Sequence, residues 1–224
     1  MNERRTRIKI CGLCRDVDAR QAIDAGADYL GFVFAASPRQ VQVSELQSWL
    51  PSVRRASRSV GLVAVFARTT RVNVESVLEA LPFDLVQVHD DGVSTDALVA
   101  ALRERGVRAV VATTAAAIGS SRLAPYAWLA DTPTRPGGTE VAGGTGVVFD
   151  WSALPPPPRA YHLFLAGGLA ADNVGRAIAS VHPYAVDASS RLEAAPREKS
   201  REKMEAFVAA VRAADSNAIG QFGA

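Results

Sequence analysis

The sequence predicts a single α/β domain built on parallel strands, because short apolar segments alternate with amphipathic helical segments from end to end. The chain has 224 residues, 48% of them hydrophobic, which suffices for one large buried core. Most of the apolar segments are continuously apolar, a pattern typical of strands that are covered on both faces. Eight such segments over this length favour a closed (β/α)8 TIM barrel over an open doubly wound sheet. The predicted strands are residues 7–11, 29–34, 60–66, 84–89, 107–112, 126–131, 161–166 and 184–188.

Between the predicted strands, apolar residues recur every three or four positions, as they do on one face of a helix. Residues 174–181 are an example. Asp172 stands where the N-cap of that helix is expected, and Gly26 stands where an earlier helix should end before a strand. Strand and helix therefore alternate throughout the chain.

No linker divides the chain, so we expect one domain over residues 1–224, with flexible tails at 1–6 and 216–224. One long irregular segment, residues 131–146, is rich in glycine, proline and threonine. It is too long for a neutral connection, and we interpret it as an active-site loop. The charged run at 196–207 is most simply the solvated face of the last helix.

The composition excludes several classes of function. The formal charge is +2, from 25 basic and 23 acidic residues spread along the chain, so we expect no nucleic-acid partner. No apolar run approaches the roughly 18 residues that span a bilayer, so we expect no membrane partner. No apolar signal-peptide core follows the basic N-terminus. These observations together predict a cytoplasmic protein.

Candidate functional residues follow from the fold, because the chemistry of such a barrel takes place at the carboxyl ends of its strands. The candidates at those positions are Cys11, Gly12, residues 34–39, Arg68, His89, Asp131, Gly167, Gly168, Asp187, Ser189 and Ser190. The loops after the seventh and eighth strands are the expected phosphate site, with backbone N–H groups of Gly167, Gly168, Ser189 and Ser190 directed at the anion.

The only two cysteines, Cys11 and Cys14, form a C-x-x-C spacing directly after the first predicted strand. A thioredoxin-like redox pair would open a helix in a different βαβ context, and a zinc site would need two further ligands. Taken alone, Cys11 is as consistent with a small buried apolar residue as with a reactive thiol. Asp131 is consistent with a functional group after a buried strand or with a turn cap, since Asp-Thr-Pro favours turns.

At these positions the sequence resembles the phosphoribosylanthranilate isomerase family of tryptophan biosynthesis. The matching motifs appear in the family's order and cover nearly the whole chain, and "GGTGVVFDW" makes the ordered set specific. The motifs are "KICG" (9–12), "AGADYLGFVF" (25–34), "SPRQV" (37–41), "VQVH" (86–89), "LADT" (129–132), "GGTGVVFDW" (143–151), "LAGGL" (165–169), "DNV" (172–174) and "VDASS" (186–190).

The resemblance implies an Amadori rearrangement of N-(5'-phosphoribosyl)anthranilate to 1-(2-carboxyphenylamino)-1-deoxyribulose 5-phosphate, with no metal or organic cofactor. It implies Cys11 as the general base and Asp131 as the general acid. Because a free aspartate titrates near a pKa of ~3.9, Asp131 would need a desolvated site, which closure of the loop after it could provide. Positive charge near Cys11 would favour its thiolate. Cys14 is expected to be structural.

The resemblance also implies a set of substrate-binding residues. Arg39 would hold the anthranilate carboxylate. The full set is Arg39, Gly143, Gly144, Gly167, Gly168, Asp187, Ser189 and Ser190. His89 is expected to line the pocket or to be hydrogen-bonded in a structural role.

The sequence departs from the family near the expected phosphate site. The family's "SSGVE" stands here as "SSRLE" (189–193), and its "PG.KD" stands as "PREKS" (196–200). Arg191 would either add a charge to the phosphate site or crowd it.

Two alternatives to the isomerase stay open at this point. The altered loops are also consistent with a diverged paralogue that acts on another aminosugar phosphate. A non-catalytic barrel that binds a sugar phosphate would not need both Cys11 and Asp131. In each case the expected partner is a small phosphorylated molecule, and the expected oligomeric state is a monomer or a homodimer.

Overall fold

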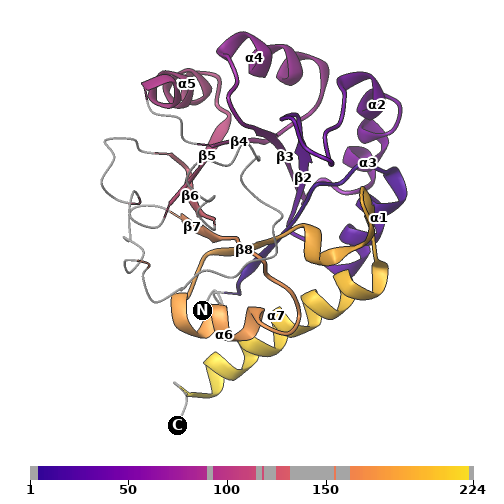
Figure 1. Ribbon diagram of the computed structural model, residues 1–224, viewed down its shortest axis with the longest axis vertical. Coiled ribbons are helices and arrows are strands. Elements are labelled where there is room, and N and C mark those ends of the chain that lie inside the picture. The colour runs from indigo at the N-terminus through magenta and orange to yellow at the C-terminus, as the bar shows by residue number, and fades with distance from the viewer. Residues whose placement is uncertain are drawn as a thin grey trace.

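The structure of the protein is a computed structural model, and it describes residues 5–89, 93–114, 118, 125–131, 154 and 162–221. Its centre is a closed barrel of parallel strands, in which each strand pairs with the next and β8 pairs with β1 (Figure 1). The predicted TIM barrel is therefore confirmed. The barrel strands are β1 (Arg7–Cys11), β2 (Tyr29–Val33), β3 (Gly61–Phe66), β4 (Leu85–His89), β5 (Arg108–Thr113), β6 (Ala127–Ala130), β7 (His162–Leu165) and β8 (Ala185–Ala188).

Helices surround the barrel (Figure 1). They are α1 (Asp16–Ala25), α2 (Val43–Gln47), α3 (Leu50–Ala56), α4 (Arg71–Ala80), α5 (Val93–Glu104), α6 (Val174–Val181) and α7 (Arg201–Gln221). Between β8 and α7 lie the short 3-10 helix η3 (Ser190–Leu192) and the strands β9 (Glu193–Ala195) and β10 (Glu198–Lys199), which pair antiparallel. Among the described residues, no helix is long and apolar enough to cross a membrane.

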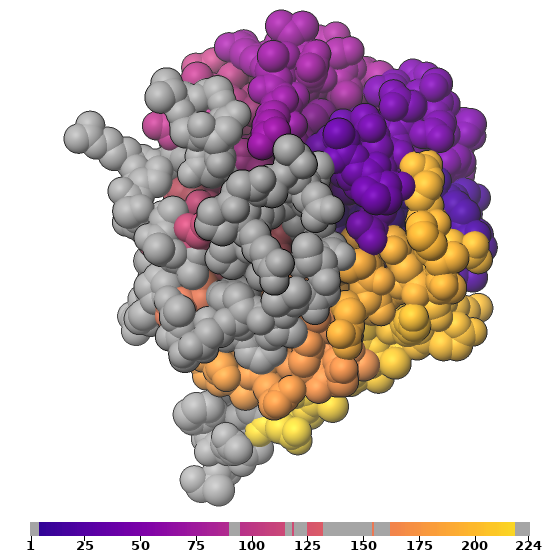
Figure 2. Space-filling model, viewed as in Figure 1, coloured from indigo at the N-terminus to yellow at the C-terminus, as the bar shows by residue number. Residues whose placement is uncertain are grey.

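The last helix packs beside the first. α7 contacts both α1 and α6, so the two ends of the chain meet on one side of the barrel. The indigo N-terminal segments and the yellow C-terminal segments accordingly lie side by side on the surface (Figure 2).

The apolar core has two parts. One lies between the barrel and the helices, and the other fills the barrel and includes Cys11 and Phe164. Because alternate side chains of a strand point to the same face, residues two positions from a member of the inner cluster also point into the barrel. The buried polar residues at such positions are Lys9, Gln87 and Asp187. Among the described residues, these three are therefore the buried polar side chains that point into the barrel.

The ends of the helices agree only in part with the sequence prediction. Gly26 ends α1 in a left-handed conformation, with φ of 103°, as predicted. The N-cap of α6 is Asn173 and not Asp172. The Asn173 side chain accepts a hydrogen bond from Ala170 N and donates one to Gly168 O, so it braces the loop that leads into the helix.

The two expected tails contain described structure. Helix α7 continues to Gln221, past the start of the expected tail at 216–224. Thr6, in the expected tail at 1–6, is 6% exposed and donates to Asp215 from both its N–H and its hydroxyl. The beginning of β1 is thereby tied to α7.

Candidate active site

Cys11 is the last residue of β1 and belongs to the apolar cluster inside the barrel. It is 8% exposed. Cys11 pairs with Gly31 of β2, and a Cβ at Gly31 would stand only 2.7 Å from Cys11 Sγ. Glycine at position 31 therefore leaves the space that the thiol occupies. Cys11 and Cys14 are both free thiols, so they form no disulfide.

An ion pair lies close to Cys11 inside the barrel. Lys9 Nζ donates to Asp187 Oδ2 at 2.7 Å, between paired positions of β1 and β8. Both residues are buried. Burial raises the pKa of the Cys11 thiol, and the charge of Lys9 opposes part of that rise. The thiol therefore lies in an apolar site with an ammonium group nearby.

Asp131 directly follows β6, at the same carboxyl-terminal rim as Cys11. Its backbone N–H donates to Thr113 O at 3.5 Å, so Asp131 extends the ladder between β5 and β6 by one position. Leu129 belongs to the inner cluster, and Asp131 lies two positions after it. Two strands, β7 and β8, separate β6 from β1 around the barrel. The carboxyl group and the thiol therefore come from separate strands on one rim.

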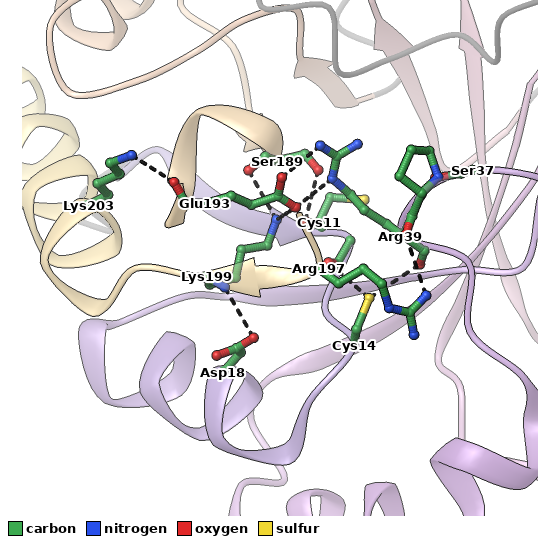
Figure 3. Close-up of polar contacts among 12 residues, drawn as sticks. Cys11, Cys14, Asp18, Ser37, Arg39, Ser189, Glu193, Arg197, Lys199 and Lys203 are labelled. Atoms are coloured by element: carbon green, nitrogen blue, oxygen red, sulfur yellow. Dashed lines mark hydrogen bonds and ion pairs between the residues drawn. The ribbon is translucent and has the colours of Figure 1, made fainter. Parts of the chain in front are cut away.

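Arg39 lies in the loop after β2, and its guanidinium is held by Glu193 at the start of β9 (Figure 3). Arg39 Nε donates to Glu193 Oε1 at 2.6 Å, and Nη2 donates to Oε2 at 2.8 Å. Arg39 Nη1 has no acceptor among the described residues. The Arg39 stem crosses Gly12, where a Cβ would stand 2.5 Å from Arg39 Cδ. Gly12, at φ of 74°, thus allows Arg39 to lie beside the Cys11 backbone.

Lys199 joins the same network from beneath (Figure 3). Its side chain is 0% exposed, and Nζ contacts Glu193 Oε1 at 3.3 Å and donates to Ser189 O at 3.0 Å. Burial lowers the pKa of Lys199, and Glu193 opposes that effect. The charged run at 196–207 was expected to face solvent, and Lys199 is an exception because it neutralises Glu193.

The loops after β7 and β8 meet at the rim beside Cys11. Gly167 and Gly168 have φ of 94° and 66°, a left-handed conformation that glycine adopts without strain. Ser189 Oγ donates to Cys11 O at 3.0 Å, and Ser190 begins η3. The structure therefore brings all four residues expected at the phosphate site to one end of the barrel.

Arg191 forms a solvent-exposed ion pair with Asp172. Its Nη2 donates to Asp172 Oδ2 at 2.9 Å, and the Arg191 and Asp172 side chains are 40% and 68% exposed. This exposed pair links η3 to the residues before α6. The effect of Arg191 on the phosphate site, added charge or crowding, stays a prediction.

A second arginine braces the loop that carries Arg39. Arg197, in the turn between β9 and β10, has φ of 68°, which is unfavourable for a residue with a side chain. Its Nη1 donates to Gln40 O and, at 3.5 Å, to Pro38 O. Cys14 Sγ lies 3.5 Å from Arg39 O and contributes to the same support, in agreement with a structural role.

His89 ends β4 on the inward side of the barrel. Burial, together with the charge of Lys9, lowers the pKa of His89 to about 4. The imidazole is therefore neutral near pH 7. That His89 lines the pocket stays a prediction.

Sequence reasoning missed three members of this arrangement. They are Lys9, which stands in the matched motif "KICG", and Glu193 and Lys199, which stand in the two segments that depart from the family. Only Lys9 carried a signal of its own, as a lysine within an apolar strand two positions from Cys11. Gly143 and Gly144, together with most of the 131–146 loop, lie outside the described residues. Within the described part of the chain, no group of three or more His, Cys, Asp or Glu residues could hold a metal ion.

A TIM barrel with candidate acid–base groups at the carboxyl ends of its strands, and glycine- and serine-containing loops after β7 and β8, is typical of enzymes with phosphorylated substrates. Comparison with known proteins defines the family. The sequence model of the family "N-(5'phosphoribosyl)anthranilate (PRA) isomerase" matches residues 8–210. An N-(5'-phosphoribosyl)anthranilate isomerase of Pseudomonas putida is 40% identical over 93% of this chain and 98% of its own. The chain belongs to the N-(5'-phosphoribosyl)anthranilate isomerase family.

Solved structures agree with this assignment. The isomerase of Thermotoga maritima matches with a TM-score of 0.78 and 29% identity, over 93% of this chain and 99% of its own. That of Thermus thermophilus matches with a TM-score of 0.76 and 28% identity, over the same fractions. A further isomerase structure, in complex with reduced 1-(o-carboxyphenylamino)-1-deoxyribulose 5-phosphate, matches with a TM-score of 0.73 and 25% identity, covering 93% of this chain and 99% of that one. The activity of this chain is accordingly the isomerisation of N-(5'-phosphoribosyl)anthranilate in tryptophan biosynthesis.

Proposed function

We propose that Cys11 is the general base and Asp131 the general acid of this isomerisation. The observation that supports the proposal most directly is the position of both residues at one rim of the barrel, on separate strands. Cys11 is an inner residue, and Asp131 continues the inward face of β6. A substrate held over this rim would have one group on each side of its sugar.

Up to the enolamine, the proposed reaction needs two proton transfers, one from Asp131 and one to Cys11. Asp131 donates a proton to the ring oxygen of the ribose, the bond from C1' to that oxygen breaks, and a protonated imine forms. The Cys11 thiolate then takes the proton from C2', and the electron pair of that C–H bond neutralises the iminium to give an enolamine. In the final tautomerisation C1' gains a proton and the C2' hydroxyl loses one, which yields the 2'-ketone.

Because Cys11 is buried, its action as a base depends on how easily its thiol ionises. Burial raises the pKa of its thiol, so the thiolate is the minor form near neutral pH. A thiolate in an apolar site is poorly solvated, however, and it is therefore more reactive toward a carbon-bound proton than a thiolate in water. Close positive charge is needed to maintain a useful thiolate population.

Substrate binding is proposed to involve the two ends of the network around Glu193. Arg39 would bind the anthranilate carboxylate through Nη1, while Nε and Nη2 stay on Glu193. The backbone N–H groups of Gly167, Gly168, Ser189 and Ser190 would bind the phosphate. Asp187 would accept a hydrogen bond from a sugar hydroxyl, since its Oδ1 is buried and has no hydrogen-bond partner among the described residues.

The acid–base assignment is tested with Cys11→Ala and Asp131→Asn, each assayed in the purified enzyme and by rescue of a tryptophan auxotroph that lacks this step. Removal of one partner of a general acid–base pair costs about 10²–10⁴-fold in kcat, and neither variant should restore growth. Cys14→Ser is the matched control, because it alters the neighbouring thiol, and it should stay active. Wild-type kcat in either catalytic variant would refute the assignment.

Two broader expectations accompany the site. We propose that the enzyme acts in the cytoplasm as a monomer or a homodimer. One related structure is described as monomers generated from a dimeric isomerase of Thermotoga maritima. Light scattering on the purified protein distinguishes a chain of 23.7 kDa from its dimer, and fractionation of the source cells tests the location.

A further inference from the structure

Lys9 is the most unusual charged residue of the barrel. It is fully buried, at 0% exposure, in the middle of β1. Moving an ammonium group out of water costs several kcal/mol even after relaxation, so a buried lysine needs an oppositely charged partner. The partner is Asp187, whose Oδ2 lies 2.7 Å from Lys9 Nζ.

The strand geometry places this pair directly beside the thiol. Lys9 and Cys11 are two positions apart on β1, so their side chains point to the same side of the strand, into the barrel. Lys9 pairs in register with Asp187 of β8, and Asp187 likewise points inward, two positions after Ala185 of the inner cluster. The ammonium group is therefore paired with the carboxylate on the neighbouring strand, on the same inward face as the thiol at the end of its own strand.

We propose that Lys9 is a positioning residue for the general base: its buried ammonium stabilises the Cys11 thiolate, and Asp187 holds that ammonium in place. The inference rests on the proposed role of Cys11 as the general base. It adds that the Lys9 ammonium makes ionisation of the Cys11 thiol easier. An ion pair that only joined β1 to β8 would not have to lie two residues from the thiol. It would also gain little over an apolar pair of similar volume.

The charges around Cys11 give the two members of the pair opposite effects. Lys9 and Lys199 favour the thiolate, and Asp187 disfavours it. Other charged or titratable groups at this end of the barrel include Arg39, whose stem crosses Gly12, and its partner Glu193. His89, which is neutral near pH 7, and Asp131 at the end of β6 belong to the same end. Removing the Lys9 charge should therefore make Cys11 harder to ionise, whereas removing the Asp187 charge should make it easier to ionise.

The test measures ionisation of Cys11 in the free enzyme, independently of catalysis. In a Cys14→Ser background, the rate of alkylation by iodoacetamide is followed from pH 6 to pH 11, and a Cys11→Ser variant of the same background confirms which thiol reacts. We expect Lys9→Met to move the midpoint of the alkylation profile up, and Asp187→Asn to move it down, each on the order of one pH unit. At pH 8 this corresponds to about a tenfold slower and a tenfold faster reaction.

Lys9→Arg keeps the charge and should leave the midpoint within a few tenths of a pH unit of the wild type. If Lys9→Met does not fold, Lys9→Gln replaces it, and Asp187→Asn tests the second half independently. Midpoints that stay unchanged, or that move in the same direction in both variants, would overturn the inference. Failure of the proposed function is a separate result, because it would appear as an active Cys11→Ala enzyme whatever the alkylation profile.

Discussion

Arg39 and Glu193 form two parallel hydrogen bonds, of 2.6 and 2.8 Å, across the rim of the barrel. Their side chains are 15% and 9% exposed, so the pair is held in a partly desolvated place. Glu193 also neutralises Lys199 beneath it. One carboxylate thus fixes the orientation of Arg39 and links it to Ser189, whose carbonyl accepts from Lys199.

Replacement of Glu193 by Gln should harm both stability and binding. A neutral amide leaves the Lys199 ammonium buried without a counter-charge, and breaking a buried pair in this way costs about 3–5 kcal/mol. We expect a loss near the lower end of that range in urea unfolding, because Gln keeps one acceptor. Binding of reduced 1-(o-carboxyphenylamino)-1-deoxyribulose 5-phosphate, measured by calorimetry, should weaken about tenfold, which is about 1.4 kcal/mol.

Glu205→Gln is the control for this variant. Glu205 pairs with Arg201 at 2.7 Å on α7, with both side chains about half exposed, and such pairs contribute only ~0.3–0.5 kcal/mol. It should leave stability and binding unchanged. Equal effects of the two variants would mean that Glu193 does not hold Arg39 in a functionally relevant position.

Gly31→Ala should reduce catalysis with little loss of binding. A Cβ at position 31 would stand 2.7 Å from Cys11 Sγ and 3.1 Å from Cys11 Cα, so the thiol must move. A misplacement of about 1 Å at a reacting group costs on the order of 10²-fold in rate. We expect kcat to fall between about tenfold and a hundredfold, and KM to change less than threefold. Steady-state kinetics on the folded variant provides the measurement.

Gly175→Ala is its counterpart away from the site. Gly175 lies in α6, and the nearest atom to its added Cβ would be Ala214 Cβ at 4.0 Å. Alanine in a helix is favoured over glycine by about 0.5–1 kcal/mol, so this variant should be at least as stable as the wild type and fully active. An undiminished kcat in Gly31→Ala would show that the thiol is not confined as described.

How far the sequence predicts this molecule depends on the kind of signal. The barrel was predictable because continuous apolar strands and amphipathic helices alternate, and local patterns of this kind report burial directly. The positions of Cys11 and Asp131 followed from the rule that barrel chemistry lies at the carboxyl ends of strands. The partners of charged residues were not predictable, because Lys9 meets Asp187 and Arg39 meets Glu193 across more than 150 positions of sequence. Lys199 was misplaced for the same reason, since a charged run normally indicates solvent unless a buried counter-charge exists.

His89 should make the protein sensitive to acid. Its pKa is lowered to about 4 in the fold by burial and by Lys9, whereas an unfolded histidine titrates near 6.5. Between these values the unfolded chain binds a proton that the folded chain does not, so stability falls as pH is lowered from about 6.5 to about 4. The full effect is at most about 3.4 kcal/mol, for a pKa difference of about 2.5. Urea unfolding at pH 7 and at pH 4.5 gives the measurement.

His89→Asn should remove much of this pH dependence. The difference in unfolding free energy between the two pH values should shrink by about 2 kcal/mol relative to the wild type. His182→Asn serves as the control, because His182 is an exposed left-handed C-cap of α6, a conformation that asparagine tolerates. If His89→Asn keeps the acid sensitivity of the wild type, as His182→Asn should, the stability that is lost at low pH does not come from His89.

Replacement of Arg197 by Gly should raise KM with little change in the free energy of unfolding. The residue adopts φ of 68° and donates to Pro38 O and Gln40 O, on either side of Arg39. Arg197→Gly removes these contacts but also the backbone strain, which costs roughly 1–2 kcal/mol for a residue with a Cβ. We therefore expect stability within about 1 kcal/mol of the wild type. KM should rise about three- to tenfold, because the loop that carries Arg39 must then be ordered by the substrate.

Arg197→Ala distinguishes the two contributions. It loses the same contacts as Arg197→Gly and keeps the strain, so it should be about 1 kcal/mol less stable than the glycine variant while showing the same rise in KM. A substrate analogue without the anthranilate carboxylate should bind the wild type and both variants equally, because the analogue lacks the group that Arg39 is proposed to bind. If the analogue also loses affinity in the variants, Arg197 supports the rim as a whole and not the Arg39 loop. If KM for the natural substrate does not change in either variant, the contacts to Pro38 and Gln40 serve only the fold.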